Sequence, residues 1–92
     1  MEKVLKETDI TYIIQEICET LTIELPKMAK EPQQVFMDGE LFCKTLYQVT
    51  TNDQGLYVIE IDGEIIRDIG AGNHKLLIET EDGYISYNLN IQ

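Results

Sequence analysis

The chain has 92 residues, 43% of them hydrophobic, so we expect a single domain over residues 1–92 with one core, and not a disordered protein. Seventeen acidic residues against seven basic ones give a net charge of −10, which argues against direct binding to nucleic acid or to anionic membranes. No apolar run reaches the roughly 20 residues of a membrane span, and no secretory signal is visible, so the expected location is cytoplasmic. A mature chain without its signal would have the same sequence.

The first 31 residues allow two interpretations. Apolar residues recur at helical spacing from Ile10 to Leu21, and Thr8 is a suitable N-cap, which predicts a helix near residues 9–19. The β-branched and aromatic run 10–14 favours a strand instead. In both interpretations Leu21–Leu25 alternates, ends at Pro26 and is expected to be a strand.

Asp-Gly occurs three times between apolar runs, at residues 38–39, 62–63 and 82–83. This dipeptide favours two-residue hairpin turns, because glycine tolerates positive φ freely and aspartate tolerates it better than most residues. Residues 52–55, Asn-Asp-Gln-Gly, predict a further turn. The strands expected around these turns are Leu21–Leu25, Gln33–Met37, Glu40–Val49, Leu56–Ile61, Glu64–Ile69, His74–Thr80 and Tyr84–Ile91.

Two of these strands have informative faces. In the last strand Ile85, Tyr87, Leu89 and Ile91 share one face, which predicts a half-buried strand. Residues 56–61 are apolar on both faces, which predicts a central strand. The fold expected is therefore an all-β antiparallel sandwich of about seven strands built from Asp-Gly hairpins, with an α+β fold carrying the N-terminal helix as the alternative.

The segment His74–Thr80, a tight turn and Tyr84–Ile91 resemble the last two strands of an immunoglobulin-like or fibronectin-III-like β-sandwich, mainly over residues 55–92. In this resemblance Leu21–Leu25 and Val35–Met37 form the pair that crosses between the sheets. The tryptophan of antibody domains is absent, and Cys18 and Cys43 do not clearly occupy that family's bridging strands. The resemblance implies adhesion, assembly or recognition, not catalysis.

No motif indicates a catalytic, cofactor or metal site. His74 is the only histidine, and nothing around it or around Cys43 matches a nucleophile motif, so we expect a turn or strand-edge histidine and no enzyme activity. The two cysteines lack a CxxC spacing and are expected to be small buried thiols, with an inter-strand disulfide as the alternative. Two groups of acidic residues are candidates for calcium ligands: Asp62, Glu64 and Asp68, or Glu81 and Asp82. Neither group matches the EF-hand pattern, so no calcium site is predicted.

The function expected is binding to another protein, as an assembly or accessory module of a phage or a bacterium, located in the cytoplasm or in the virion. The partner would have a basic or an apolar surface, and association of the chain as a homo-oligomer is a further alternative. The alternative is a small acidic inhibitor that mimics nucleic acid, of the anti-CRISPR or anti-restriction type. The residues predicted to contact the partner are Glu40, Glu60, Glu64, Glu79, Glu81 and Tyr84. A second, apolar candidate surface combines Leu56, Val58 and Leu77 with Tyr84.

Overall fold

The computed structural model describes residues 4–27 and 30–92. Within these residues it contains eight strands, a 3-10 turn and one short helix. In chain order they are β1 (Val4–Tyr12), β2 (Leu21–Glu24), β3 (Gln34–Met37), β4 (Glu40–Leu41), η1 (Lys44–Leu46), β5 (Tyr47–Thr51), β6 (Tyr57–Ile61), α1 (Gly63–Ile69), β7 (Gly72–Thr80) and β8 (Gly83–Ile91). None of the helices in this part of the chain is long and apolar enough to cross a membrane.

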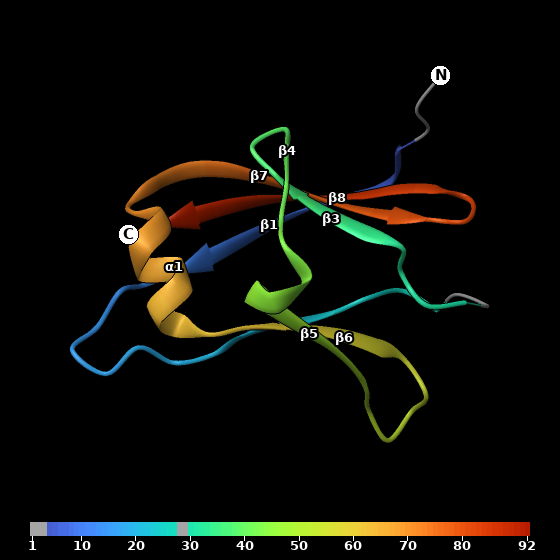
Figure 1. Ribbon diagram of the computed structural model, residues 1–92, viewed down its shortest axis with the longest axis horizontal. Helices are drawn as coiled ribbons and strands as arrows, with labels where there is room; N and C mark the ends of the chain where they lie inside the picture. Colours follow the sequence, from blue (N-terminus) through green and yellow to red (C-terminus); the bar gives the residue numbers. More distant parts are fainter. Residues whose placement is uncertain (1–3, 28–29) are drawn as a thin grey trace.

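The strands form two sheets that face each other (Figure 1). The five-stranded sheet has the order β1-β8-β7-β3-β4, and the three-stranded sheet has the order β2-β6-β5. All neighbours are antiparallel except β1 and β8, which pair in parallel. In Figure 1 the five-stranded sheet lies above the three-stranded sheet, and α1 closes one end between them. The predicted all-β sandwich is confirmed, with one short helix.

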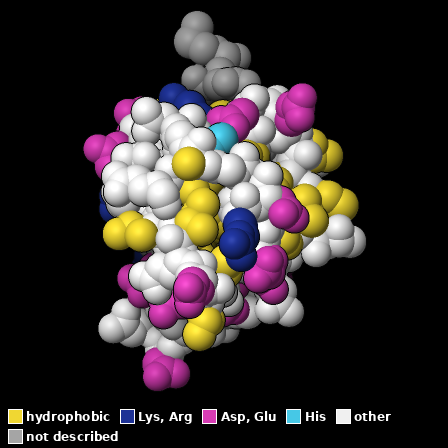
Figure 2. Space-filling view, turned by 90° about the vertical axis from the view of Figure 1, so that its left-hand side faces the viewer, with side chains coloured by type: hydrophobic (Ala, Val, Ile, Leu, Met, Phe, Trp, Pro, Cys, Tyr) yellow, Lys and Arg dark blue, Asp and Glu magenta, His cyan; other side chains and the backbone are white. Residues whose placement is uncertain are grey.

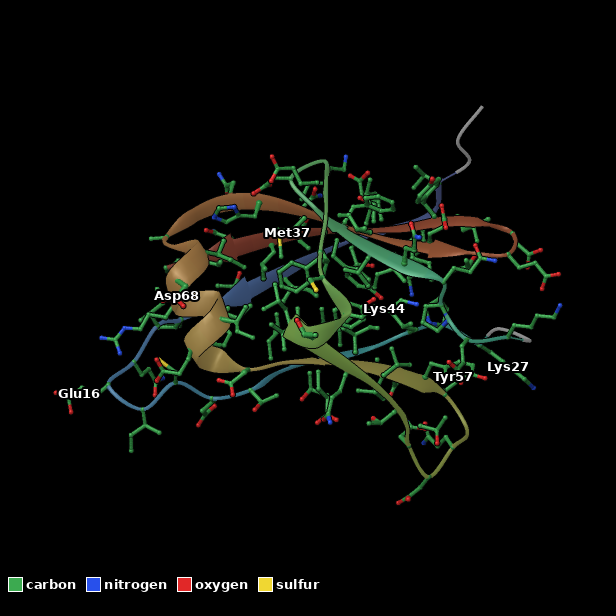
Figure 3. The ribbon with its side chains drawn as sticks, viewed as in Figure 1. Glu16, Lys27, Met37, Lys44, Tyr57 and Asp68 are labelled. Carbon is green, nitrogen blue, oxygen red and sulfur yellow. The ribbon has the colours of Figure 1, made fainter. Side chains whose placement is uncertain are left out.

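The core lies between the two sheets, as Figure 3 shows for the side chains around Met37. The predicted inward face of the last strand is confirmed, because all four of its residues are at most 4% exposed. β6 is central in its sheet, as its two apolar faces predicted. The chain also passes from one sheet to the other between β2 and β3, as the resemblance implied.

The N-terminal segment is a strand, so the helix considered near residues 9–19 is wrong. β1 extends to Tyr12, and residues 13–20 form an irregular loop. The parallel ladder with β8 supplies the hydrogen bonds of the backbone, and it continues through the amide of Ile14, which donates to Gln92 O at 2.8 Å. Pairing with a distant strand therefore outweighed the local helical spacing.

The predicted strand Glu64–Ile69 is wrong, because these residues belong to α1. The Asp62 side chain accepts a 2.9 Å hydrogen bond from the amide of Glu64 and caps the helix. Gly70, with φ of 95°, ends it and donates to Ile66 O. The Asp-Gly pair at 62–63 thus starts a helix and makes no hairpin.

The predicted strand Glu40–Val49 is divided into three pieces. β4 covers Glu40–Leu41 in the five-stranded sheet, and β5 begins at Tyr47 in the other sheet. The turn η1 lies between them, where the chain passes from the five-stranded sheet to the three-stranded sheet. A continuous strand would have stayed in one sheet. The Phe42 amide still donates to Val35 O of β3, and the Phe42 ring lies in the core, stacked on Tyr47 with ring centroids 5.9 Å apart.

The remaining turns follow the sequence closely. At Asp38-Gly39 both residues have positive φ, 54° and 85°, which confirms the predicted hairpin turn. The hairpin predicted at 82–83 exists but is shifted by one residue, since Thr80 pairs with Gly83 and the turn residues are Glu81 and Asp82. The turn at residues 52–55 is confirmed, with Asn52 Oδ1 accepting from two following amides.

Candidate functional site

The outer face of the five-stranded sheet carries a row of residues that crosses all its strands. The registers place Leu77 beside Phe36 on one side and beside Ser86 on the other. Phe36 in turn pairs with Leu41 at the β4 edge, and Ser86 pairs with Glu7 at the β1 edge. This face is opposite to the core because the neighbours of these residues along each strand point inward.

Four apolar side chains on this face form what we call the outer patch: Phe36, Leu41, Leu77 and Tyr84. Leu41 is 62% exposed, and the other three are partly exposed. The rings of Phe36 and Tyr84 lie 6.4 Å apart at an interplanar angle of 58°, an arrangement favourable for aromatic pairs. The Tyr84 hydroxyl donates to Glu79 Oε2 at 3.1 Å, which orients the ring.

Ser86 lies in the same row and is completely buried, although its face points away from the core. Its hydroxyl oxygen has no hydrogen-bond partner among residues 4–27 and 30–92. A buried hydroxyl without a partner loses its hydration and receives nothing in return.

Replacing Ser86 with alanine is therefore expected to raise the free energy of unfolding by about 1 kcal/mol. Urea unfolding, followed by circular dichroism, measures this change. The control is Thr51→Ala at an exposed position of β5, which should change the free energy of unfolding little. A clear destabilisation by Ser86→Ala would contradict the interpretation, since it would mean that the hydroxyl is satisfied by a bound water.

Acidic side chains lie at two edges of the outer patch, whereas the exposed Lys75 lies two residues before Leu77 on the same face of β7. Glu79 lies beside Tyr84 in the next row, and Glu81 lies in the adjoining turn, where it forms a 3.5 Å ion pair with Lys30. Glu7 and Asp9 on β1 both accept hydrogen bonds from the Asn88 amide. The surface is thus apolar in its centre and mainly negative at its edges.

The structure brings together only part of the predicted contact set. Glu79, Glu81 and Tyr84 lie at one end of the β7–β8 hairpin, and Glu40 is exposed on the edge strand β4. Glu60 lies on β6 in the other sheet, and Glu64 lies on α1.

The apolar alternative is divided in the same way. Leu77 and Tyr84 share the outer face of the five-stranded sheet. Val58 lies in the other sheet and is only 7% exposed, and Leu56 precedes the same strand. The sequence analysis missed Phe36 and Leu41 as partners of Leu77. Counting outward from the Asp38-Gly39 turn pairs Phe36 with Leu41 and would have found them.

Glu60 lines a hollow of about 370 Å³, together with Asp62, Thr20 and Gln48. Glu60 also accepts a 3.4 Å hydrogen bond from the Thr50 hydroxyl. The described residues contain no group of three or more His, Cys, Asp or Glu side chains placed to hold a metal ion. Leu46, Tyr47 and Ile65 also line this hollow, so its walls are both polar and apolar.

His74 and Cys43 have separate partners. The two ring nitrogens of His74 contact Asp38 and Gly70. The Cys43 sulfur lies 3.2 Å from the Thr45 hydroxyl, and hydrogen bonding to Thr45 lowers the pKa of this thiol. Both cysteines are free, Cys43 is exposed and Cys18 is partly exposed, so the expectation of two buried thiols is wrong.

A second exposed apolar area lies on the loop between β1 and β2, where Ile13 is 59% exposed and Ile17 is 81% exposed. Figure 2 views the end of the sandwich near α1 and shows hydrophobic side chains in separate groups among acidic ones. These groups are less continuous than the outer patch, whose members pair in register.

No protein-family model matches the sequence. Comparison with curated proteins also finds no match.

Solved structures, in contrast, resemble the fold. A tri-modular GH5 (subfamily 4) endo-beta-1,4-glucanase from Bacillus licheniformis, complexed with cellotetraose, matches with a TM-score of 0.67 and 12% identity over 90% of this chain and 17% of that chain. An I-band fragment of titin matches with a TM-score of 0.55 and 14% identity, over 97% of this chain and 32% of the fragment. A titin Ig tandem matches with a TM-score of 0.50 and 14% identity, over 98% and 45%.

The chain spans less than half of each of these longer proteins. Identities of this size are evidence of fold alone, and function does not follow from fold. The structure has two facing sheets of five and three strands, and its first and last strands pair in parallel. These features and the superpositions on solved structures indicate the same fold. The chain has the immunoglobulin-like β-sandwich fold.

Proposed function

We propose that this domain is a non-catalytic binding module, and that its outer patch docks a protein surface with an apolar centre and basic residues around it. The observation that carries the proposal is the row of paired apolar side chains on the outside of the five-stranded sheet. A sheet face that is not covered by another layer normally carries polar residues. Exposed apolar clusters rimmed by polar groups mark interaction sites.

The charge of the protein supports a basic partner. The chain carries −10, and Glu7, Glu79 and Glu81 lie around the patch. Complementary charge speeds association and aligns the two surfaces, while the apolar centre supplies most of the binding energy. A second copy of this chain is disfavoured as the partner, because both copies would bring the same negative edge to the interface.

The nucleic-acid mimic is less well supported as a function. Such a mimic needs its carboxylates on one surface, whereas Glu60 and Glu64 lie outside the sheet that carries Glu79 and Glu81. A basic groove would therefore meet only some of them at once. The similarity in fold to one part of longer proteins is consistent with an accessory module.

The proposal can be tested with peptides selected from a random library for binding to the intact protein. We expect the selected peptides to combine aromatic or aliphatic residues with Arg or Lys. Phe36→Ala and Leu77→Ala should each weaken their binding about tenfold, or about 1.4 kcal/mol, measured by isothermal titration calorimetry. The dissociation constant should depend only weakly on salt, because apolar contacts dominate.

The matched control is Ile17→Ala, which removes an even more exposed apolar side chain far from the patch in sequence and should leave binding unchanged. Circular dichroism of each variant establishes that the fold is retained. Peptides that bind the two patch variants as tightly as the unmodified protein would refute the proposal. Selection of purely basic peptides, with affinity that falls steeply with salt, would support the mimic instead.

A further inference from the structure

His74 lies at the start of β7, beside two other segments of the chain. Its Nδ1 atom is 2.6 Å from Asp38 Oδ2, in the turn between β3 and β4. Its Nε2 atom is 3.0 Å from the carbonyl oxygen of Gly70, the residue that ends α1. Figure 2 shows the histidine at the surface near an acidic side chain. The side chain is only 16% exposed.

The chemistry of these two contacts determines the protonation state of the ring. A carbonyl oxygen and an ionised carboxylate only accept hydrogen bonds. A neutral imidazole has one N–H group and one lone pair, so one of the two short contacts would place a lone pair against an oxygen. Only the doubly protonated ring donates in both directions.

We propose that His74 is held as an imidazolium and acts as a pH-sensitive latch that fastens the β3–β4 turn to the end of α1. In addition to the ring, the latch includes two hydrogen bonds between Asp38 and Lys75. The Asp38 amide donates to Lys75 O, and the Lys75 amide donates back to Asp38 Oδ1, both at 2.8 Å. Asp38 itself has φ of 54°, a conformation that these contacts help to maintain.

The two charges nearest the ring act in opposite directions. Asp38 contacts the ring and favours the imidazolium, whereas the cation Lys75 on the same strand opposes it. Lys75 lines the hollow beside the ring, with Asn73 and Asn88. The hydrogen bond to Asp38 raises the pKa of His74 above 6.5, against the effect of partial burial, and the contact with Gly70 acts in the same direction. For Asp38, partial burial opposes the shift, but the bonds from His74 and Lys75 lower its pKa.

The direction of the pH effect follows. The pKa of His74 is higher in the folded protein than in the unfolded chain, so the stabilisation is complete below about pH 6.5 and is lost as pH rises through the folded pKa. Above that pKa the ring keeps one hydrogen bond and loses the other. The turn that carries β4, and with it Leu41, then becomes less firmly attached to α1. The latch does not depend on the proposed function.

The experiment is an NMR titration of the His74 ring nitrogens in the intact protein. We expect a pKa above 6.5 and, at pH 6, two protonated nitrogens. Asp38→Asn retains a residue that tolerates positive φ but removes the charge, and it should lower the pKa. Each unit by which it falls reduces the ratio of folded to unfolded protein at low pH tenfold.

Hydrogen exchange provides a second readout. After correction for intrinsic rates, the amides at residues 38–41 and 70 should lose protection above the folded pKa, whereas those of β6 should not. The variant His74→Gln should abolish this pH dependence. A His74 pKa at or below 6.5, or a pKa unchanged in Asp38→Asn, would overturn the proposal even if the outer patch binds its peptides.

Discussion

Replacing Gly63 with alanine is expected to lower the free energy of unfolding by about 2–3 kcal/mol. Gly63 is the first residue of α1 and is buried against the loop between β1 and β2. A Cβ atom there would lie 2.5 Å from the Cys18 carbonyl carbon and 2.5 Å from Glu19 O. These are backbone atoms, so they cannot move away as a flexible side chain would.

The sign of this effect is diagnostic. In an isolated helix, alanine is more favourable than glycine by about 1 kcal/mol. A loss of stability therefore reports the tertiary contact and not helix propensity. The control is Asp68→Ala, an exposed position of the same helix visible in Figure 3, for which we expect little change. Chemical unfolding measures both variants, and a stabilised Gly63→Ala would show that the loop does not pack closely against α1.

The second large effect is expected at Ile59, which is fully buried in the central strand β6. In register it lies between Ile23 of β2 and Val49 of β5, where the three-stranded sheet faces the other layer. Ile59→Ala removes methyl groups from between two stiff sheets that cannot close the space. We expect a loss of about 3–4 kcal/mol in the free energy of unfolding.

A graded series distinguishes loss of packing from a general effect of mutation. Ile59→Val should cost only about 1 kcal/mol, because it removes a single methyl group. Ile17→Ala, at a position that is 81% exposed, should leave thermal and urea unfolding almost unchanged. Equal losses for the valine and alanine variants would contradict the packing argument.

The failed strand at residues 64–69 shows how a pattern can indicate the wrong element. Asp-Gly before an apolar run is typical of a hairpin, and Ile65 and Ile66 are β-branched. The same residues also carry helix signals, with Asp62 as N-cap and Gly70 after the last turn. The local sequence does not decide between the two, and in the folded chain the helix begins at Gly63, packed closely on the loop between β1 and β2.

The candidate site, like the fold, was predictable from the sequence only in part. The alternation of the last strand puts Tyr84 and Ser86 on the face opposite to Ile85, and the structure has them on the outer face. Glu79, predicted from the sequence as a contact residue, lies beside Tyr84, while its role in binding stays a prediction. The joining of Leu77 to Phe36 required knowledge that β3 pairs with β7. Such pairings join residues about 40 positions apart, and no local pattern encodes them.

Local chemistry was sufficient for the elements whose geometry depends on a few neighbouring residues. The Asp38-Gly39 turn, the inward face of β8 and the central position of β6 all follow from positive φ, alternation and apolar content. The tertiary structure decided β1, the division of residues 40–49 and α1, because their backbone hydrogen bonds and buried faces depend on distant segments. It also decided the site, since the outer patch exists only where four strands lie side by side.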